Sequence, residues 1–141
     1  MEQFEKDLYS QLCYELNSKL VMFTFIKKDG TIRNLLGTKS KSQIQVMSED
    51  AFRKLSGYEK RASIDNGNLA VVDMVIAEPR MVNVERLLRC VVIDSMYIDT
   101  YNDAYEPMKL FEKFCEESKE VYGEKLEMDT FDKKVKEIIR V

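Results

Sequence analysis

The residues of this chain best suited to chemistry are ten basic side chains concentrated between Ser18 and Ala62. Only four acidic residues share that segment, so it carries a net charge of +6 within a protein whose overall charge is −3. Lysine and arginine attract phosphate groups through a salt-sensitive interaction that does not depend on base sequence, and a neighbouring tyrosine ring could stack on a base. The candidate contacts for nucleic acid or another partner are Lys27, Lys28, Arg33, Lys39, Lys41, Arg53, Lys54, Tyr58, Lys60 and Arg61.

These cations also have simpler explanations, which the sequence leaves open. Lysines at a hairpin tip often serve only solubility and protect sheet edges from aggregation. Residues 92–132 hold twelve acidic against four basic residues, a net charge of −8. That acidic segment could imitate a nucleic-acid backbone, cover the basic segment of the same chain, or form the solvated face of an amphipathic helix. A one-sided charge distribution of this size bears on partners and not on fold.

The chain lacks the residues that several common kinds of catalysis require. The chain has no histidine, which removes the usual general base at neutral pH and the commonest ligand of transition metals. It has no glycine-rich phosphate loop and no Gly-x-Ser-x-Gly elbow. Cys13, Cys90 and Cys115 are far apart with apolar neighbours, which favours buried, reduced thiols. We therefore expect a non-enzymatic protein without metal or cofactor, with carboxylate or Mg²⁺ chemistry as the remaining enzymatic route.

The elements that must position these residues follow from local patterns, and we expect one domain over residues 1–141. Apolar residues recur every four positions over residues 2–17, which predicts an amphipathic helix. The pair Asp29-Gly30 stands between two β-rich runs and predicts a tight type I′ hairpin turn. Ser48, followed by two acids, predicts a capped helix that ends near Gly57, and residues 44–46 read as a short extended piece.

Further apolar runs complete the predicted fold. The hairpin strands, residues 69–77, 81–84 and 89–98 make about five strands, the inventory of an SH3-like or Sm-like barrel. We therefore predict an α+β protein whose antiparallel five-stranded barrel spans residues 19–99, with a helical insert at 39–68. Residues 105–141 should form two C-terminal helices, the first over 105–122 and ended by Gly123. The second carries an apolar stripe of Phe131, Val135, Ile138 and Ile139.

Two blocks of this sequence resemble a known family. Residues 23–38, with the pattern Phe-x-Phe-x-Lys-Lys-Asp-Gly-Thr-Ile-Arg-x-x-x-Gly-Thr, are similar to the opening hairpin of small phage and prophage proteins with an Sm-like SH3 barrel, which are related to WYL domains. Residues 71–73, Arg80 and residues 84–87 are similar to the second block of that family. The chain departs from the pattern at Pro79, where an aromatic residue is expected, and in its long insert.

The resemblance implies a barrel fold, a phage origin and a regulatory or host-directed role, and it supplies no catalytic residue. It also makes Arg80 and Arg86 possible ligand or partner contacts, because relatives are proposed to use such positions. The alternative is that these arginines pair with Asp73, Glu78 or Glu85 on neighbouring strands.

Two functional hypotheses follow from these patterns. The first is a phage accessory protein that engages nucleic acid or nucleic-acid-associated host machinery through the basic barrel face of residues 19–61. The second is a host-takeover or anti-defence inhibitor that binds a host protein directly. No apolar run approaches the roughly 20 residues that a membrane helix needs, and the acidic N-terminus does not resemble a secretory signal. We therefore expect a cytoplasmic protein that does not engage a membrane.

Overall fold

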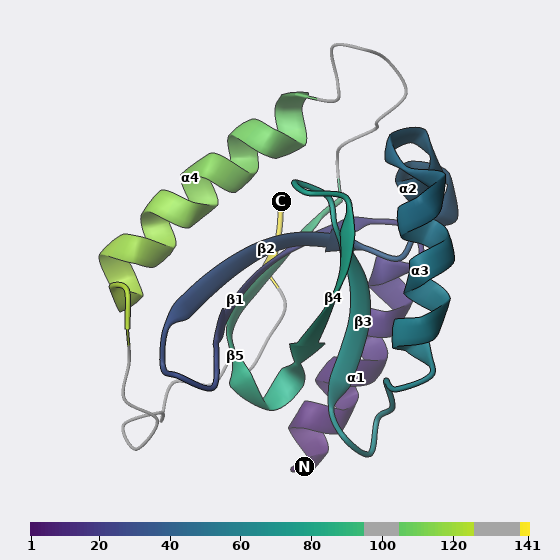
Figure 1. Ribbon diagram of the computed structural model, residues 1–141. Helices are drawn as coiled ribbons and strands as arrows, with labels where there is room; N and C mark the ends of the chain where they lie inside the picture. Colours follow the sequence, from purple (N-terminus) through teal and green to yellow (C-terminus); the bar gives the residue numbers. More distant parts are fainter. Residues whose placement is uncertain (95–104, 126–138) are drawn as a thin grey trace.

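The computed structural model describes residues 1–94, 105–125 and 139–141. Helices cover a strongly bent sheet on both of its faces (Figure 1). In chain order the elements are α1 (Gln3–Leu16), β1 (Leu20–Ile26), β2 (Ile32–Thr38), α2 (Lys41–Met47), α3 (Glu49–Glu59), β3 (Asn68–Asp73), β4 (Glu78–Asn83), the 3₁₀ helix η1 (Val84–Arg86), β5 (Leu87–Ile93), α4 (Tyr105–Tyr122) and β6 (Ile139–Arg140).

The described strands form one sheet in the order β4-β3-β2-β1-β5-β6. All neighbours are antiparallel except β5 and β6, which are parallel. The five predicted strands are present, but the prediction of a five-stranded antiparallel barrel needs correction. The described strands form a mixed sheet of six strands that is not closed, with β4 and β6 at its edges. Strand β3 pairs with β2 only at Gly37 and Thr38, so the β3–β4 hairpin diverges from the rest. Two-residue β6 is too short to leave a sequence pattern.

Strand β1 is buried along its whole length and separates two hydrophobic cores. Successive strand residues point to opposite faces. Accordingly Phe23 packs with Leu12 and Leu16 of α1 in the first core, whereas Met22 packs with residues of α3 and α4 in the second. On the α4 side, the Thr24 hydroxyl lies 2.8 Å from that of Ser118 and donates to Asn34 Oδ1 at 2.7 Å. The hydroxyl groups of Thr24 and Ser118 therefore have hydrogen-bond partners although both side chains are buried.

The turn between β1 and β2 lies at Asp29-Gly30 as predicted, but it is not of type I′. Gly30 has φ of 86°, and among the described residues Ala77 is the only non-glycine with positive φ, so Asp29 is not in the left-handed region. The Gly30 amide donates to the Lys27 carbonyl at 2.9 Å. This is the pattern of a type I turn followed by a left-handed glycine. The Asp29 carboxylate accepts from the Thr31 amide and hydroxyl, which stabilises this alternative.

The insert between β2 and β3 contains two helices. Residues 44–46, predicted as extended, lie in α2, because only a helical turn places Ile44 in the second core while Val46 stays exposed. The predicted cap of α3 is confirmed: Ser48 Oγ accepts from the Ala51 amide at 3.1 Å. Gly57 does not end α3, which continues to Glu59 without a left-handed residue at Gly57.

At the C-terminal end of the chain, α4 occupies the predicted helix 105–122 and Gly123 follows it with φ of 71°. Most of the second predicted helix, including Phe131, Val135 and Ile138, lies outside the described residues. Ile139 lies in strand β6 and pairs with Val91, so the prediction of a helix through Ile139 is wrong.

The three cysteines are free, and burial raises the pKa of Cys90 to about 12.

A network of four charged side chains connects β6 to α1 and β5. Glu15 is only 3% exposed and binds both Arg140 and Lys19, the latter at 3.0 Å. Lys19 Nζ also lies 2.7 Å from Asp94, and Arg140 Nη1 lies 3.3 Å from the same carboxylate. Arg140 and Lys19 lower the pKa of Glu15, and Lys19 and Arg140 lower that of Asp94. Both carboxylates therefore hold their charge more firmly in the folded state than in the unfolded chain.

This network predicts an acid-sensitive contribution to stability. Glu15→Gln should reduce the free energy of unfolding at pH 7 by about 1.5–3 kcal/mol, because hydrogen bonds to a charged, buried acceptor are lost. Since the folded-state pKa of Glu15 lies below its unfolded value, the stabilisation is complete above about pH 5 and is lost as the pH falls through the folded-state pKa. Urea unfolding of both proteins at pH 7 and in acid should show the difference shrinking with acidity.

The matched control is Asp7→Asn, which removes an exposed carboxylate from the same helix. It should change the free energy of unfolding by no more than about 0.5 kcal/mol. A pH-independent loss in Glu15→Gln would contradict the charge network as its cause.

Candidate functional site

Most of the predicted cations fall into two groups at different ends of the molecule, and not on one barrel face. Lys27 and Lys28 are exposed at the β1–β2 tip, which lies on the far side of the sheet from α3 (Figure 1). This tip adjoins the end of α4: the Ile32 amide donates to the Glu124 carbonyl at 2.9 Å, and Thr31 pairs with Lys125. The two lysines therefore share their surroundings with the acidic end of α4.

The second group lies on the insert, and we call it the insert surface: Lys39, Lys41, Arg53, Tyr58, Lys60 and Arg61. The two insert helices bring its ends together, because Lys39 Nζ lies 3.7 Å from Glu59 and Lys41 Nζ lies 5.6 Å from the Phe52 ring. The Arg61 guanidinium lies 4.7 Å from the centre of the Tyr58 ring, a stacked cation–π contact. Tyr58 is half-buried against the second core, so the ring that supports Arg61 is fixed.

Four of the predicted contacts are ion-paired within the protein. Arg33 lies 3.5 Å from Asp73 across the sheet, and Lys39 pairs with Glu59 as described. Arg53 and Lys54 both bind Asp50, and Lys54 also lies 3.8 Å from Glu78. Arg53 and Lys54 lower the pKa of Asp50. For Lys27, Lys28, Lys41, Lys60 and Arg61 no carboxylate lies within 4 Å in the described part of the chain.

Arg80 and Arg86 do not make the cross-strand pairs that were the alternative explanation for them. Arg80 donates to the adjacent Pro79 carbonyl at 2.8 Å. In the described residues Arg86 Nη1 is buried without a hydrogen-bond partner. Their expected acceptors are engaged elsewhere, Asp73 by Arg33 and Glu78 by Lys54. Arg89, on β5, binds Glu117 at 3.0 Å and stacks on Phe114, which attaches α4 to β5.

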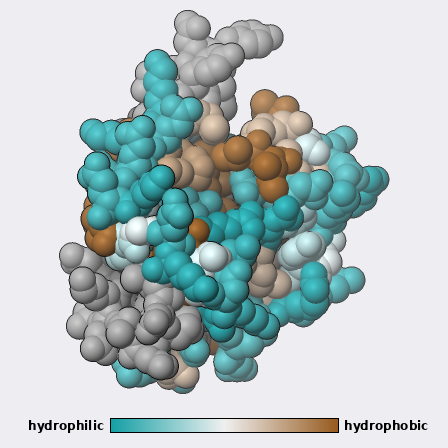
Figure 2. Space-filling model, turned by 60° about the vertical axis from the view of Figure 1, so that its left-hand side comes forward, coloured by the Kyte–Doolittle hydropathy of each residue, from teal (hydrophilic) through white to brown (hydrophobic). Residues whose placement is uncertain are grey.

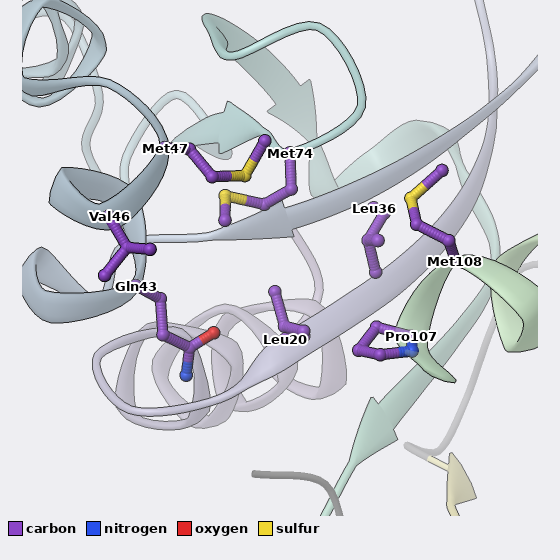
Figure 3. A pocket seen from close by; sticks show the side chains of 8 residues that line it. All are labelled: Leu20, Leu36, Gln43, Val46, Met47, Met74, Pro107 and Met108. Carbon is purple, nitrogen blue, oxygen red and sulfur yellow. The ribbon is translucent and has the colours of Figure 1, made fainter. Parts of the chain in front are cut away.

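An apolar pocket, which sequence reasoning missed, opens between α2, the sheet and the start of α4. Its volume is about 200 Å³. Figure 2 shows hydrophobic side chains exposed among hydrophilic ones on the side of the molecule that carries α4. The three lining methionines come from parts of the chain far apart in the sequence, so no local pattern could reveal the pocket (Figure 3). The lining residues are Leu20, Leu36, Gln43, Val46, Met47, Met74, Pro107 and Met108.

Other kinds of site are not seen in the described residues. Within residues 1–94, 105–125 and 139–141, no group of three or more His, Cys, Asp or Glu side chains is arranged to hold a metal ion. None of the helices in these ranges combines the length and the apolar character needed to span a bilayer.

The exposed side of α3 yields a prediction about Gly57. Its backbone is helical, and a Cβ added there would meet no atom within 4 Å. Gly57→Ala should therefore raise the free energy of unfolding by about 0.5–1 kcal/mol, because alanine loses less backbone entropy in a helix. Thermal or urea unfolding measures this change.

The control for this variant is Gly37→Ala in β2. A Cβ there would lie 2.9 Å from Leu35 Cδ2 and 3.1 Å from Val71 Cγ2 in the first core. That variant should destabilise the protein, by about 1–3 kcal/mol, because the core is overpacked. Equal responses at the two glycines would contradict the assigned environments.

Comparison with known proteins identifies the fold family. The family model described as WYL_2, Sm-like SH3 beta-barrel fold, matches residues 9–88, from the middle of α1 to the start of β5. No curated protein and no solved structure matches the chain. The match confirms the predicted Sm-like fold and includes the insert, whereas α4 and β6 lie outside it. This family is not a known enzyme family. Because the match covers more than half of its residues, the chain belongs to the WYL_2 family of Sm-like SH3 beta-barrel proteins.

Proposed function

We propose that this protein binds nucleic acid through the insert surface, without catalysing a reaction. The observation that carries the proposal is the exposed side of α3. Arg53 and Lys60 are separated by seven positions, or about two turns, and so share one side of the helix. Gly57 lies between them and leaves the surface open. A phosphate backbone can approach this surface closely, with Lys60 at one end of the contact and Arg53, which also pairs with Asp50, at the other.

The neighbouring residues extend this contact. Lys60 and Arg61 are exposed at the end of α3, and Lys41 is exposed at the start of α2. Their charges attract phosphates without reading the base sequence. Tyr58, fixed beneath the Arg61 guanidinium, adds a π surface of the kind on which unpaired bases stack. The arrangement favours single-stranded nucleic acid, because stacking needs a base that is not paired.

The charge distribution favours the insert surface over the hairpin tip. The exposed residues of α4 include Glu112, Glu116 and Glu120, and Glu124 follows at its end. Since the hairpin tip lies beside this end of α4, the α4 carboxylates weaken the attraction of Lys27 and Lys28 for phosphate, although Lys119 lies 3.5 Å from Glu124 and partly neutralises it. Around the end of α3, Glu59 is partly neutralised by Lys39.

The wider role that we propose is that of a small accessory protein of phage, acting in the cytoplasm on nucleic acid or on machinery bound to it. The basis for the phage assignment is the resemblance of residues 23–38, residues 71–73, Arg80 and residues 84–87 to small phage and prophage proteins. Direct binding to a host protein, as an inhibitor, is the second candidate, and the exposed apolar pocket favours it.

The proposal predicts that two charge-removing double variants differ in binding. Lys60→Gln with Arg61→Gln should weaken binding of labelled single-stranded DNA or RNA about tenfold at low salt, measured by fluorescence polarisation. Each phosphate contact with a single strand releases about 0.7 counterions. Loss of two contacts should therefore reduce the magnitude of the slope of log affinity against log salt by about 1.4.

Lys27→Gln with Lys28→Gln is the matched control, since it removes the same charge from exposed positions at the hairpin tip. Its affinity and salt slope should stay close to those of the unaltered protein. Equal losses in both variants would mean that only the overall charge matters. Absence of binding at about 50 mM salt to DNA and RNA alike would rule out the proposed function.

A further inference from the structure

The apolar pocket has a size that suits one ring system and not a large ligand. Its volume of about 200 Å³ exceeds that of an engineered cavity of about 150 Å³ that accepts benzene. It falls below the roughly 300–1,000 Å³ of pockets that hold drug-sized ligands. Met47 and Met74 line one side, and Met108 and Pro107 line the other (Figure 3). A bicyclic aromatic group therefore matches the space better than a nucleotide or a cofactor.

Gln43 supplies one polar atom to this otherwise apolar lining. Its amide nitrogen donates to the Ser18 carbonyl at 3.1 Å, which sets the orientation of the amide. Its amide oxygen is buried and has no hydrogen-bond partner among the described residues. In Figure 3 this oxygen points toward the interior of the pocket, whereas the nitrogen points away. A buried acceptor without a donor is costly, so the pocket favours an occupant that brings one N–H or O–H group.

The methionines favour an aromatic occupant over an aliphatic one. Thioether sulfur makes favourable contacts with aromatic rings, and the unbranched side chain adapts to their shape. Met47, Met74 and Met108 bring three such groups from α2, the β3–β4 turn and α4. Indole combines a flat apolar body with a single N–H donor and no acceptor. Among the side chains of proteins, tryptophan thus fits both the shape and the one free acceptor.

We propose that this pocket binds the tryptophan side chain of a partner protein. The chain itself contains no tryptophan, so neither another part of it nor a second copy supplies the occupant. The rim extends the contact beyond the ring, because Val46 and Met47 are 77% and 50% exposed. A partner surface around the tryptophan would cover these side chains, which a free small molecule of this size would leave in water. The proposal is independent of the insert surface and of nucleic-acid binding.

Titration with N-acetyl-tryptophanamide tests the proposal, because this compound presents tryptophan as it occurs within a chain. The emission of the probe reports its burial directly, since the protein has no tryptophan of its own. We expect a saturable blue shift with a dissociation constant in the millimolar range or tighter. In spectra of the ¹³C-methyl-labelled protein, the methionine signals of Met47, Met74 and Met108 should shift, while those of Met1 and Met81 stay in place.

Two comparisons separate this site from non-specific apolar binding. Benzothiophene has the shape of indole without the N–H group and should bind about tenfold more weakly than indole. The Gln43→Met variant should still bind indole and benzothiophene, but with no preference for indole. Met47→Ala should weaken binding of N-acetyl-tryptophanamide severalfold, whereas Met81→Ala, on β4 and outside the pocket, should not.

Three outcomes would overturn the proposal. The first is no saturable binding of N-acetyl-tryptophanamide at about 10 mM. The second is binding of free indole without binding of N-acetyl-tryptophanamide, which would assign the pocket to a small molecule. The third is an unchanged preference for indole over benzothiophene in Gln43→Met.

Discussion

Strand β1 has no solvent-facing side, and this constraint organises the rest of the molecule. All seven of its residues are buried, so both faces of the sheet at β1 need a helical cover. Helix α1 covers the face that carries Phe23, and α3 and α4 cover the face that carries Met22. Little bare sheet is left for recognition in the described part of the chain. The surfaces available to a partner are therefore those that the covering helices themselves present.

The insert both covers the sheet and presents a surface to a partner. The inner sides of α2 and α3 bury Ile44, Ala51 and Leu55 in the second core. Their outer sides present cations around an open glycine, and the edge of α2 forms part of the apolar pocket. Because the inner sides are held by the core, the backbone that carries the outer groups is positioned without ligand. Such preorganisation reduces the entropy lost on binding. The surface proposed to bind nucleic acid and the pocket proposed to bind tryptophan thus adjoin on the insert.

The parts of the fold that sequence could predict are those with local signals. Asp29-Gly30 marks a turn, Ser48 caps α3 and Gly123 follows α4, and each acts through neighbouring backbone groups. Two failures are local, namely the type of the turn at Asp29-Gly30 and the end of α3 near Gly57, and the others involve distant partners. Ile44 is helical because it fills a core completed by other elements, and β6 exists through Val91 and the charges around Glu15. The pairing of Arg33 with Asp73, and the meeting of Met47, Met74 and Met108, likewise depend on topology and not on spacing.

The most direct measurement of the central claim, that the insert is the binding element of this barrel, is residue-resolved amide NMR during titration with single-stranded oligonucleotide. The account predicts that the largest shifts fall on Lys41 and residues 58–61, with the hairpin tip at Lys27–Gly30 nearly unchanged. Largest shifts at the hairpin tip, or shifts spread evenly over all exposed lysines, would contradict it.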